Sequence, residues 1–419
     1  MLLAKFMMMK DMCSMKEQSK LKKTAFYFFG SMVEVCVFPV LIITVVLRRL
    51  FFCKSTLPIS IFIGLMHTNN MTYVAKAMRQ KGYNVQVVPW IIPEHEVDVI
   101  PYDVNFKRQY PHLYSHFIGQ YILIFLVFIW VILKFDIFVL PFRNRLLDRT
   151  VWLKWLEIPL LHFARKKVIL NTYGGDVATP RLRRRVDLKY SLYDGYLADP
   201  QYRIYNEKAI ARNTRALEKQ ADCVISAIDH VDYLDRVDEY FHLRCIDTEN
   251  IQAKYEVSNK IPVFVHAPNH RLVKGTAKII EAVESLNKQG FTCELKIIEN
   301  TSNKRLLEII GEADAVIDQL LLGTYARLAI EAMALGKPVF CYLRSDLYQF
   351  NPIWNDSPII DVNPDTLELC LKKFLKSTKI QRIEIGMKSR SYIEKYHSLE
   401  YIGKRFDKII QKIFNTQLT

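Results

Sequence analysis

The sequence predicts two α/β domains, each built on a parallel sheet and facing each other across a cleft, with an apolar helix before the first. Three observations predict this fold class. The 419 residues exceed one ordinary domain. From Pro58 onward, short apolar runs alternate with amphipathic segments, as in parallel sheets with crossover helices. A polar stretch at 247–260, ending near Pro262, divides this pattern and is interpreted as a linker.

Residues 1–55 are expected to form a basic N-terminus and a membrane anchor. The segment Thr24 to Leu47 has 24 residues and one charged side chain, Glu34. As a helix it would measure roughly 36 Å, against about 30 Å for the hydrocarbon core of a bilayer. Arg48 and Arg49 follow it where a signal peptide would have small residues, so cleavage is not expected.

The sequence leaves three relations of this segment to a membrane open. Basic residues flank it on both sides, and for a single span the positive-inside rule would export the rest of the chain. A re-entrant or interfacial anchor, kinked at Pro39, would return both basic flanks to one face. A soluble core helix is the third alternative. We expect membrane attachment, with the two α/β domains on the cytoplasmic side of the membrane.

The net charge indicates which classes of partner the protein binds, and the cysteine content indicates its redox compartment. The formal charge of +15 favours an anionic partner: nucleic acid, a lipid surface or a phosphorylated small molecule. Nucleic acid is not expected, because no recognition motif is present and the aromatic residues lie in apolar runs. The eight cysteines include no C-x-x-C pair, which favours a reducing compartment and gives no ligand spacing for a metal.

The first α/β domain is expected over 56–258. An apolar run at 121–133 is too short to span a bilayer and is interpreted as a core helix in preference to membrane contact. A helix at 71–82 is expected to end at Gly82. The strands are expected at 59–65, 84–90, 134–142, 166–176 and, as the last of this half, 221–228.

The second domain is expected over 259–395. Its helices are predicted at 276–288 and at 325–336, where Gly336 ends the second of them. A basic helical region follows at 382–413, and the C-terminal helix in 396–419 is expected to pack back on the first domain. The strands are expected at 262–268, 293–299, 313–320 and 337–343.

The stretch "VFVHAPNHRLVKGTAKIIEAV" (263–283) places cations at the N-terminus of a helix. Gly275 and Thr276 open the helix, and Arg271 and Lys274 come just before it. Free N–H groups and two cations suit a diphosphate, although neither standard nucleotide fingerprint is present. A solvated basic loop is the alternative. His270 is a candidate to reach the same ligand.

A second stretch, "DQLLLGTYARLAIEAMALGKPVFCYL" (318–343), places Glu331 on a helix between two strands. A carboxylate near the carboxyl end of a strand can bind the vicinal hydroxyls of a ribose. A surface glutamate is the alternative interpretation.

These two stretches, together with "NTYGGDV" (171–177), resemble the family-four glycosyltransferases of GT-B fold in their bacterial surface-polysaccharide branch. The resemblance extends from about Ile59 to the C-terminus and is strongest over 261–343. It implies two Rossmann-like domains and a retaining transfer from a nucleotide-diphosphate sugar to a lipid-linked or cell-surface glycan. It implies no cofactor and no obligatory metal.

The resemblance also assigns donor-site roles. The pair that neutralises the departing diphosphate matches Arg271 and Lys274, and the glutamate that holds the ribose matches Glu331. A second family glutamate, eight residues earlier, is replaced by Gly323, so the donor sugar must be held by other groups. The candidates for donor binding, beside Glu331, are Gly275, Thr276, Asp318, Gln319, Gly323, Thr324 and His270.

On the acceptor side, "TYGGDV" resembles the family's glycine-aspartate turn. Gly174 and Gly175 would let the backbone approach a ligand, and Asp176 would orient the acceptor or cap the next helix. The polar turn "MHTNN" (66–70) follows the first strand, and His67, Asn69 and Asn70 are expected to line the cleft.

Two rival functions fit the same residues. A catalytically silent GT-B subunit of a membrane complex would keep the fold without the reaction. A nucleotide-sugar 2-epimerase would share the two-domain architecture but would not need the segment Thr24 to Leu47.

Overall fold

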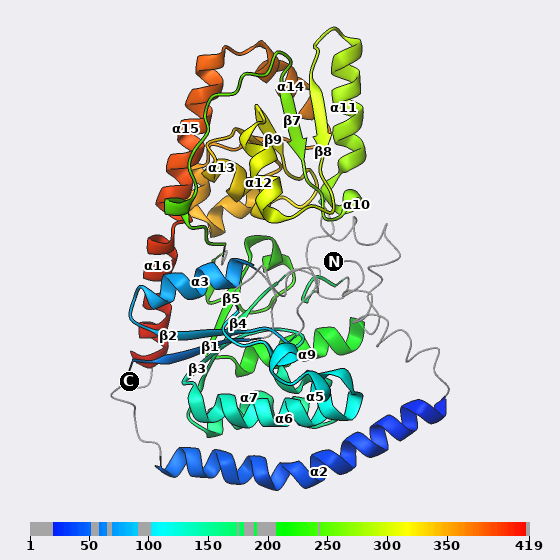
Figure 1. The fold of residues 1–419 in the computed structure, drawn as a ribbon, viewed down its shortest axis with the longest axis vertical. Helices are drawn as coiled ribbons and strands as arrows, with labels where there is room; N and C mark the ends of the chain where they lie inside the picture. Colours follow the sequence, from blue (N-terminus) through cyan, green and yellow to red (C-terminus); the bar gives the residue numbers. More distant parts are fainter. Residues whose placement is uncertain are drawn as a thin grey trace.

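The computed structural model has two parallel sheets, one below the other in Figure 1, with a long helix beneath the lower one. This confirms the predicted two-sheet α/β architecture. The structure describes residues 20–51, 58–64, 69–90, 102–173, 176–179, 188–190, 207–241 and 244–415.

The first sheet has six parallel strands in the order β2-β1-β3-β4-β5-β6. Five of them match predicted strands to within a few residues. The sixth, β6, was not expected, because 221–228 was interpreted as the last strand of this half. Their bounds are β1 (Ser60–Gly64), β2 (Asn84–Val88), β3 (Ile137–Pro141), β4 (Lys167–Asn171), β5 (Cys223–Ser226) and β6 (Glu239–Tyr240).

Side chains that alternate along these strands enter two separate cores. Ile61, Val139 and Ile225 pack against α3 (Asn69–Arg79) and α16 (Leu399–Asn415). Phe62, Leu140 and Val224 face the opposite core. The helices of that second core are α6 (Phe117–Lys134), α7 (Glu157–Phe163) and α9 (Glu207–Gln220). The apolar run at 121–133 therefore supplies one face to this core, as predicted, while Ile122 and Leu126 on its other face are exposed.

The second sheet has five parallel strands in the order β11-β10-β9-β7-β8. The two-residue strand β11 is additional to those predicted. Its neighbours coincide closely with the expected apolar runs. The bounds are β7 (Val263–His266), β8 (Glu294–Ile297), β9 (Ala315–Ile317), β10 (Val339–Cys341) and β11 (Ile360–Asp361).

Helices cover both faces of the second sheet. Phe264, Ile317 and Phe340 pack with the helices of one face, whereas Val265 and Val316 pack with those of the other. The first face is covered by α11 (Thr276–Lys288) and α14 (Leu367–Lys376). The other is covered by α12 (Asn303–Gly311), α13 (Arg327–Ala334) and α15 (Lys379–Tyr396).

Short helical segments complete the described chain. Three are α-helical, namely α4 (Phe106–Gln109), α5 (Pro111–Ser115) and α10 (Arg271–Lys274). The others are 3₁₀ turns: η2 (Leu146–Arg149), η3 (Leu153–Trp155), η5 (Ile228–Asp232), η6 (Thr248–Asn250), η7 (Ser345–Phe350) and η8 (Pro352–Asp356).

The C-terminal helix α16 lies against α3 of the first sheet (Figure 1). Ile402 and Phe406 supply buried side chains there, and the Tyr83 hydroxyl donates to the Asp407 carboxylate at 2.6 Å. The chain thus returns to the first sheet after completing the second. The exact domain boundaries stay predictions.

The N-terminal apolar segment forms α2 (Lys20–Phe51), one continuous helix with Pro39 inside it. It lies along the outer surface of α6 and α7 (Figure 1). The helix continues through Pro39 without ending, so the re-entrant or interfacial anchor, one of the three alternatives left open by the sequence, stays a prediction. By length and composition Tyr27–Phe51 is apolar enough to cross a membrane.

Candidate functional site

The candidate site lies where the carboxyl ends of the two sheets meet. Arg344, three residues after β10, forms an ion pair with Asp232 at the end of η5, which follows β5. The Arg344 Nη1 and Asp232 Oδ2 atoms are 2.5 Å apart, and both side chains are buried. The strand ends of both sheets therefore contribute to one junction, as expected for ligand sites in parallel sheets.

The two predicted phosphate-binding cations lie on the short helix α10. Gly275 follows it in the left-handed conformation, with φ of 77°, and separates α10 from α11. A Cβ at this position would lie 3.2 Å from the Leu320 Cβ. Arg271 and Lys274 are thus placed at opposite ends of one helical turn.

Arg271 is exposed and makes a bidentate ion pair with Glu299. Its Nε lies 2.9 Å from Glu299 Oε1 and its Nη2 lies 2.6 Å from Oε2. Glu299 lies two residues after β8, the neighbour of β7 in the sheet. The geometry is the fork that guanidinium also offers to a phosphate.

Lys274 is buried, and its ammonium is held by two side chains from the end of β9. Its Nζ lies 3.1 Å from Asp318 Oδ1 and also donates to the Gln319 side-chain oxygen. The other Asp318 oxygen, Oδ2, accepts from the backbone N–H of Ala326 at 2.8 Å. A buried ammonium needs such compensation for its lost hydration.

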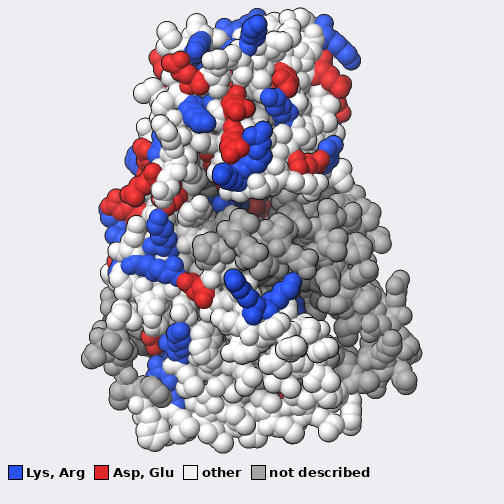
Figure 2. All heavy atoms as spheres, viewed as in Figure 1, with Lys and Arg blue, Asp and Glu red and all other residues white. Residues whose placement is uncertain are grey.

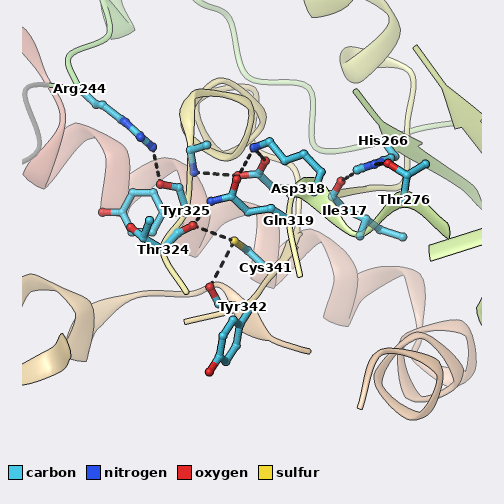
Figure 3. Close-up of polar contacts among 12 residues, drawn as sticks. Arg244, His266, Thr276, Ile317, Asp318, Gln319, Thr324, Tyr325, Cys341 and Tyr342 are labelled. Carbon is cyan, nitrogen blue, oxygen red and sulfur yellow. Dashed lines mark hydrogen bonds and ion pairs between the residues drawn. The ribbon is translucent and has the colours of Figure 1, made fainter. Parts of the chain in front are cut away.

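This arrangement differs from the expected role of Asp318 and Gln319. Both side chains have no exposed surface. The Gln319 amide donates to the Thr324 carbonyl, while its oxygen accepts from Lys274 (Figure 3). In this structure the two residues fix Lys274 and the loop at 323–326, and their side chains do not face outward to a sugar.

His266 and Thr276 form a buried pair behind α10. The imidazole Nδ1 lies 2.8 Å from the Ile317 carbonyl oxygen, and Nε2 lies 2.9 Å from the Thr276 hydroxyl (Figure 3). Burial lowers the pKa of His266 to about 4, so the ring is neutral at pH 7. The Thr276 hydroxyl therefore supports the helix start. His270 is half-buried at the N-cap of α10.

Glu331 is buried in α13, with one carboxylate oxygen bound by two neighbours. Its Oε1 accepts from Asn303 Nδ2 at 2.9 Å and from Arg327 Nε at 2.7 Å. The Arg327 guanidinium in turn lies 5.9 Å from the ring centroid of Tyr73, on α3 of the first sheet. Glu331 is thus close to the junction and is not a surface glutamate.

Gly323 provides the space that Arg344 occupies. It has φ of 75°, and a Cβ there would lie 2.3 Å from Arg344 Cγ and 2.4 Å from Cδ. The Arg344 N–H donates to the Gly323 carbonyl at 3.0 Å. The residue that replaces the second family glutamate therefore accommodates a guanidinium side chain that reaches the first sheet.

The acceptor-side residues are described in part. Asp176 is half-buried, and its Oδ1 accepts from the Tyr173 N–H at 2.9 Å. Burial raises its pKa, an effect that the charge of nearby His230 opposes. Asn70 lies in the first turn of α3, not in a preceding turn, and accepts from the Cys245 N–H at 2.9 Å.

The remaining acceptor-side predictions lie outside the described residues. His67, Gly174 and Gly175 are not described, and for Asn69 only the helical backbone at the start of α3 is described.

The sequence interpretation missed several residues at this junction. Arg344 and Asp232 each follow a predicted strand, a position that could have marked them as ligand-side residues. Asn303 and Tyr73 had no such signal, because each lies on a helix whose orientation depends on the tertiary fold.

The junction combines cations with carboxylates already in place. Arg271 faces Glu299 and Lys274 faces Asp318, so the two cations are locally neutralised. An anion bound here would gain charge-assisted hydrogen bonds while competing with Glu299 for the exposed guanidinium. Among the described residues, no group of three His, Cys, Asp or Glu side chains is arranged to hold a metal ion.

A surface groove of about 500 Å³ lies elsewhere, along α9. It receives no residue from either strand edge, so we do not assign the candidate site to it. Its lining residues are Lys208, Ala211, Arg212, Arg215, Ala216 and Lys219.

Comparison with known proteins shows the fold. No family model and no curated protein sequence matches the chain. Sucrose-phosphate synthase from Thermosynechococcus elongatus superposes with a TM-score of 0.54 at 12% identity, over 86% of this chain and 100% of that one. A glycosyltransferase from Rickettsia africae gives 0.54 at 14% identity, over 86% and 99%. Anabaena HepE, solved with UDP-glucose, gives 0.52 at 11%, over 84% and 99%.

Proposed function

From the GT-B fold that the chain shares with these structures, we propose that it is a glycosyltransferase that uses a nucleotide-diphosphate sugar. The observation that carries the proposal is the placement of Arg271 and Lys274 on one turn at the carboxyl end of β7. Two cations at that edge suit the diphosphate of the donor. The complex of HepE with UDP-glucose supports a donor of this class.

The two cations have different roles in this proposal. Lys274 is fixed by Asp318 and Gln319, so it is preorganised to stabilise the negative charge that develops on the leaving diphosphate. Arg271 is exposed and exchanges Glu299 for a phosphate oxygen when the donor binds. Glu331 holds the ribose hydroxyls beside Arg327, and no cofactor or obligatory metal takes part.

The finer features rest on the resemblance to family four. The proposed transfer retains the anomeric configuration, and Asp176 orients the acceptor near the first sheet. The acceptor is a lipid-linked or cell-surface glycan, as in polysaccharide biosynthesis. The protein is attached to a membrane through α2, with both sheets on the cytoplasmic side. Gly323 and the loop that contains Thr324 border the donor sugar.

A catalytically silent GT-B subunit is the second candidate. It is favoured by one observation: Arg271, Lys274 and Glu331 each already have an oppositely charged partner within the chain.

Nucleotide binding separates the two functions. The purified full-length protein is titrated with UDP, GDP, ADP and CMP, alongside Lys274→Ala and the exposed α11 control Lys278→Ala. We expect one diphosphate to bind wild type and Lys278→Ala, with roughly a hundredfold loss in Lys274→Ala. No binding of any nucleotide to wild type would contradict the proposed donor site and leave the silent subunit as the better description.

A further inference from the structure

The helix α2 carries two apolar stripes on opposite sides, and the described residues of the protein cover one of them. The inner stripe includes Leu41 and Val45, which have no exposed surface and belong to the core beneath α6. The outer stripe recurs every three or four residues, with 45 to 69% of each side chain exposed. Its members include Phe28, Met32, Val35, Ile43, Leu47 and Leu50.

A buried carboxylate fixes the orientation of α2. Glu34 has no exposed surface, and its Oε2 accepts from the backbone N–H groups of Trp152 at 2.8 Å and Leu153 at 3.0 Å. Its Oε1 accepts from the Val151 N–H and the Tyr121 hydroxyl. The one acidic side chain of the apolar segment therefore points into the domain and is satisfied there.

This docking determines how the helix can meet a bilayer. A helix crossing the membrane would leave α6 and α7, and Glu34 would lose four hydrogen bonds and enter hydrocarbon, where an unpaired carboxylate is strongly unfavourable. A docked helix keeps these bonds and lies along the surface of the domain, as in Figure 1. Only its outer stripe then contacts lipid.

Basic side chains that lie next to aromatic rings are found near the outer stripe of α2. Basic and aromatic residues of this kind are typical of the interface with an anionic membrane. The Arg49 guanidinium lies 4.8 Å from the ring of Phe163 on α7. The Lys134 ammonium lies 5.1 Å from the ring of Trp130 on α6. The end of the molecule formed by α2 shows few charged side chains in the view of Figure 2.

Helix α6, which contacts α2, also carries an exposed apolar stripe. Ile118, Ile122 and Leu126 are each at least 43% exposed at intervals of one helical turn. Large apolar patches open to water are rare on soluble monomers and mark contact sites for membranes or other proteins.

We propose that α2 is an in-plane anchor that stays docked on the first domain and inserts its outer stripe into one leaflet of an anionic bilayer without crossing it. The proposal rests on the membrane attachment proposed above and is independent of glycosyl transfer. It places α6 and α7 at the lipid surface and both sheets on the same side as the N-terminus.

Vesicle flotation tests the insertion. The full-length protein is floated with phosphatidylcholine vesicles that contain phosphatidylglycerol, beside the double variant Ile43→Glu/Leu47→Glu. The matched control, Leu369→Glu/Met387→Glu, changes two exposed apolar residues on α14 and α15. We expect the bound fraction to fall by about tenfold or more in the α2 variant and to stay unchanged in the control.

Failure of wild type to float, or flotation of the α2 variant like wild type, would overturn the proposal. If wild type is a dimer that does not float with vesicles, and Ile43→Glu/Leu47→Glu makes it a monomer, the outer stripe would instead be a contact with a second copy of the chain. Nucleotide binding by the same variants is measured in parallel, so that a failed anchor is distinguished from a failed donor site.

A topology experiment separates an in-plane from a spanning helix. Epitope tags before Met1 and after Thr419 are digested with protease in sealed membrane vesicles of each orientation. The in-plane anchor places both tags on the same side. Tags protected in opposite orientations would show that α2 crosses the bilayer and would overturn the proposal.

Discussion

Arg344 and Asp232 join the two sheets through an ion pair between residues 112 positions apart in the chain. Nη1 lies 2.5 Å from Oδ2 and Nη2 lies 3.2 Å from Oδ1, so the contact is bidentate. Arg344 also binds Asp346 at 2.7 Å, within its own loop. A buried pair of this kind fixes the relative position of two strand edges at which a ligand is expected.

The first prediction concerns the stability of this pair. Arg344→Gln leaves the buried Asp232 carboxylate without its cation, and we expect the free energy of unfolding to fall by about 3 kcal/mol. Asp232→Asn should cost less, because Arg344 keeps Asp346. Urea denaturation measures both. The control Arg305→Gln removes an exposed ion pair with Glu308 and should leave the transition unchanged. Equal shifts in all three variants would contradict the structural role of Arg344.

The second prediction uses two glycines with similar backbones and different surroundings. Gly323 and Gly290 have φ of 75° and 85°, but a Cβ meets Arg344 only at Gly323 and finds nothing within 4 Å at Gly290. Gly290→Ala should therefore cost about 1 kcal/mol, from backbone conformation alone. Gly323→Ala should cost about 2 kcal/mol more, from overpacking.

A double variant identifies the cause. In an Arg344→Ala background, the additional cost of Gly323→Ala should shrink, because the Cγ and Cδ atoms that the new Cβ would meet are then absent. Strict additivity of the two changes would show that Gly323 acts independently of Arg344.

The local elements could be predicted from the sequence, whereas the pairing between distant residues could not. Helix α11 coincides with the predicted 276–288, because its apolar residues recur at the helical period. Strands β6 and β11 have two residues each and show no period; they exist because β5 and β10 offer edges for parallel pairing.

The same distinction holds for the candidate site. Arg271 and Lys274 stood out because they come just before a predicted helix, and Glu331 stood out because it lies on a predicted helix between two strands. Their partners did not stand out. Glu299 binds Arg271 only because β8 lies beside β7, and Asp318 was interpreted as a sugar ligand because the sequence does not show that its side chain turns inward to Lys274.

The third prediction concerns Lys274 as a charge in the reaction. Lys274→Met keeps the length of the side chain and removes its ammonium, so we expect kcat/KM for the donor to fall by about a hundredfold or more. Asp318→Asn should give a smaller loss, since Lys274 then keeps Gln319 as a partner. The control is Lys278→Met, one turn further along in α11 and exposed. Activity of Lys274→Met within twofold of wild type would contradict the assignment.

The fourth prediction tests Glu331 as the ribose ligand. Whichever nucleoside diphosphate binds, wild type should prefer it over its 2′-deoxy form by about tenfold, because the 2′-deoxy form lacks one of the two hydroxyls that the Glu331 carboxylate would accept from. In Glu331→Gln this preference should disappear, together with part of the affinity for the ribose form. Isothermal titration of both ligands measures it, with Glu281→Gln on the exposed face of α11 as the control. An unchanged preference in Glu331→Gln would assign the ribose to another residue.

The last prediction concerns the stability of the fold in acid. Burial lowers the pKa of His266 and of His397 to about 4, whereas an exposed histidine titrates near 6.5. Between these values the unfolded chain binds protons that the native chain does not, so stability is intact above pH 6.5 and declines as the pH falls toward 4.

Each ring contributes at most about 3 kcal/mol to this decline, at 1.36 kcal/mol for each pKa unit. Urea denaturation at a series of pH values should show the loss in wild type and a flatter profile in His266→Gln and His397→Gln. The exposed His112→Gln on α5 should follow wild type. If the unfolding free energy of a variant depends on pH as steeply as that of wild type, the histidine that it replaces is protonated without penalty in the native state. The bonds from His266 to Ile317 and Thr276 would then not require a neutral ring.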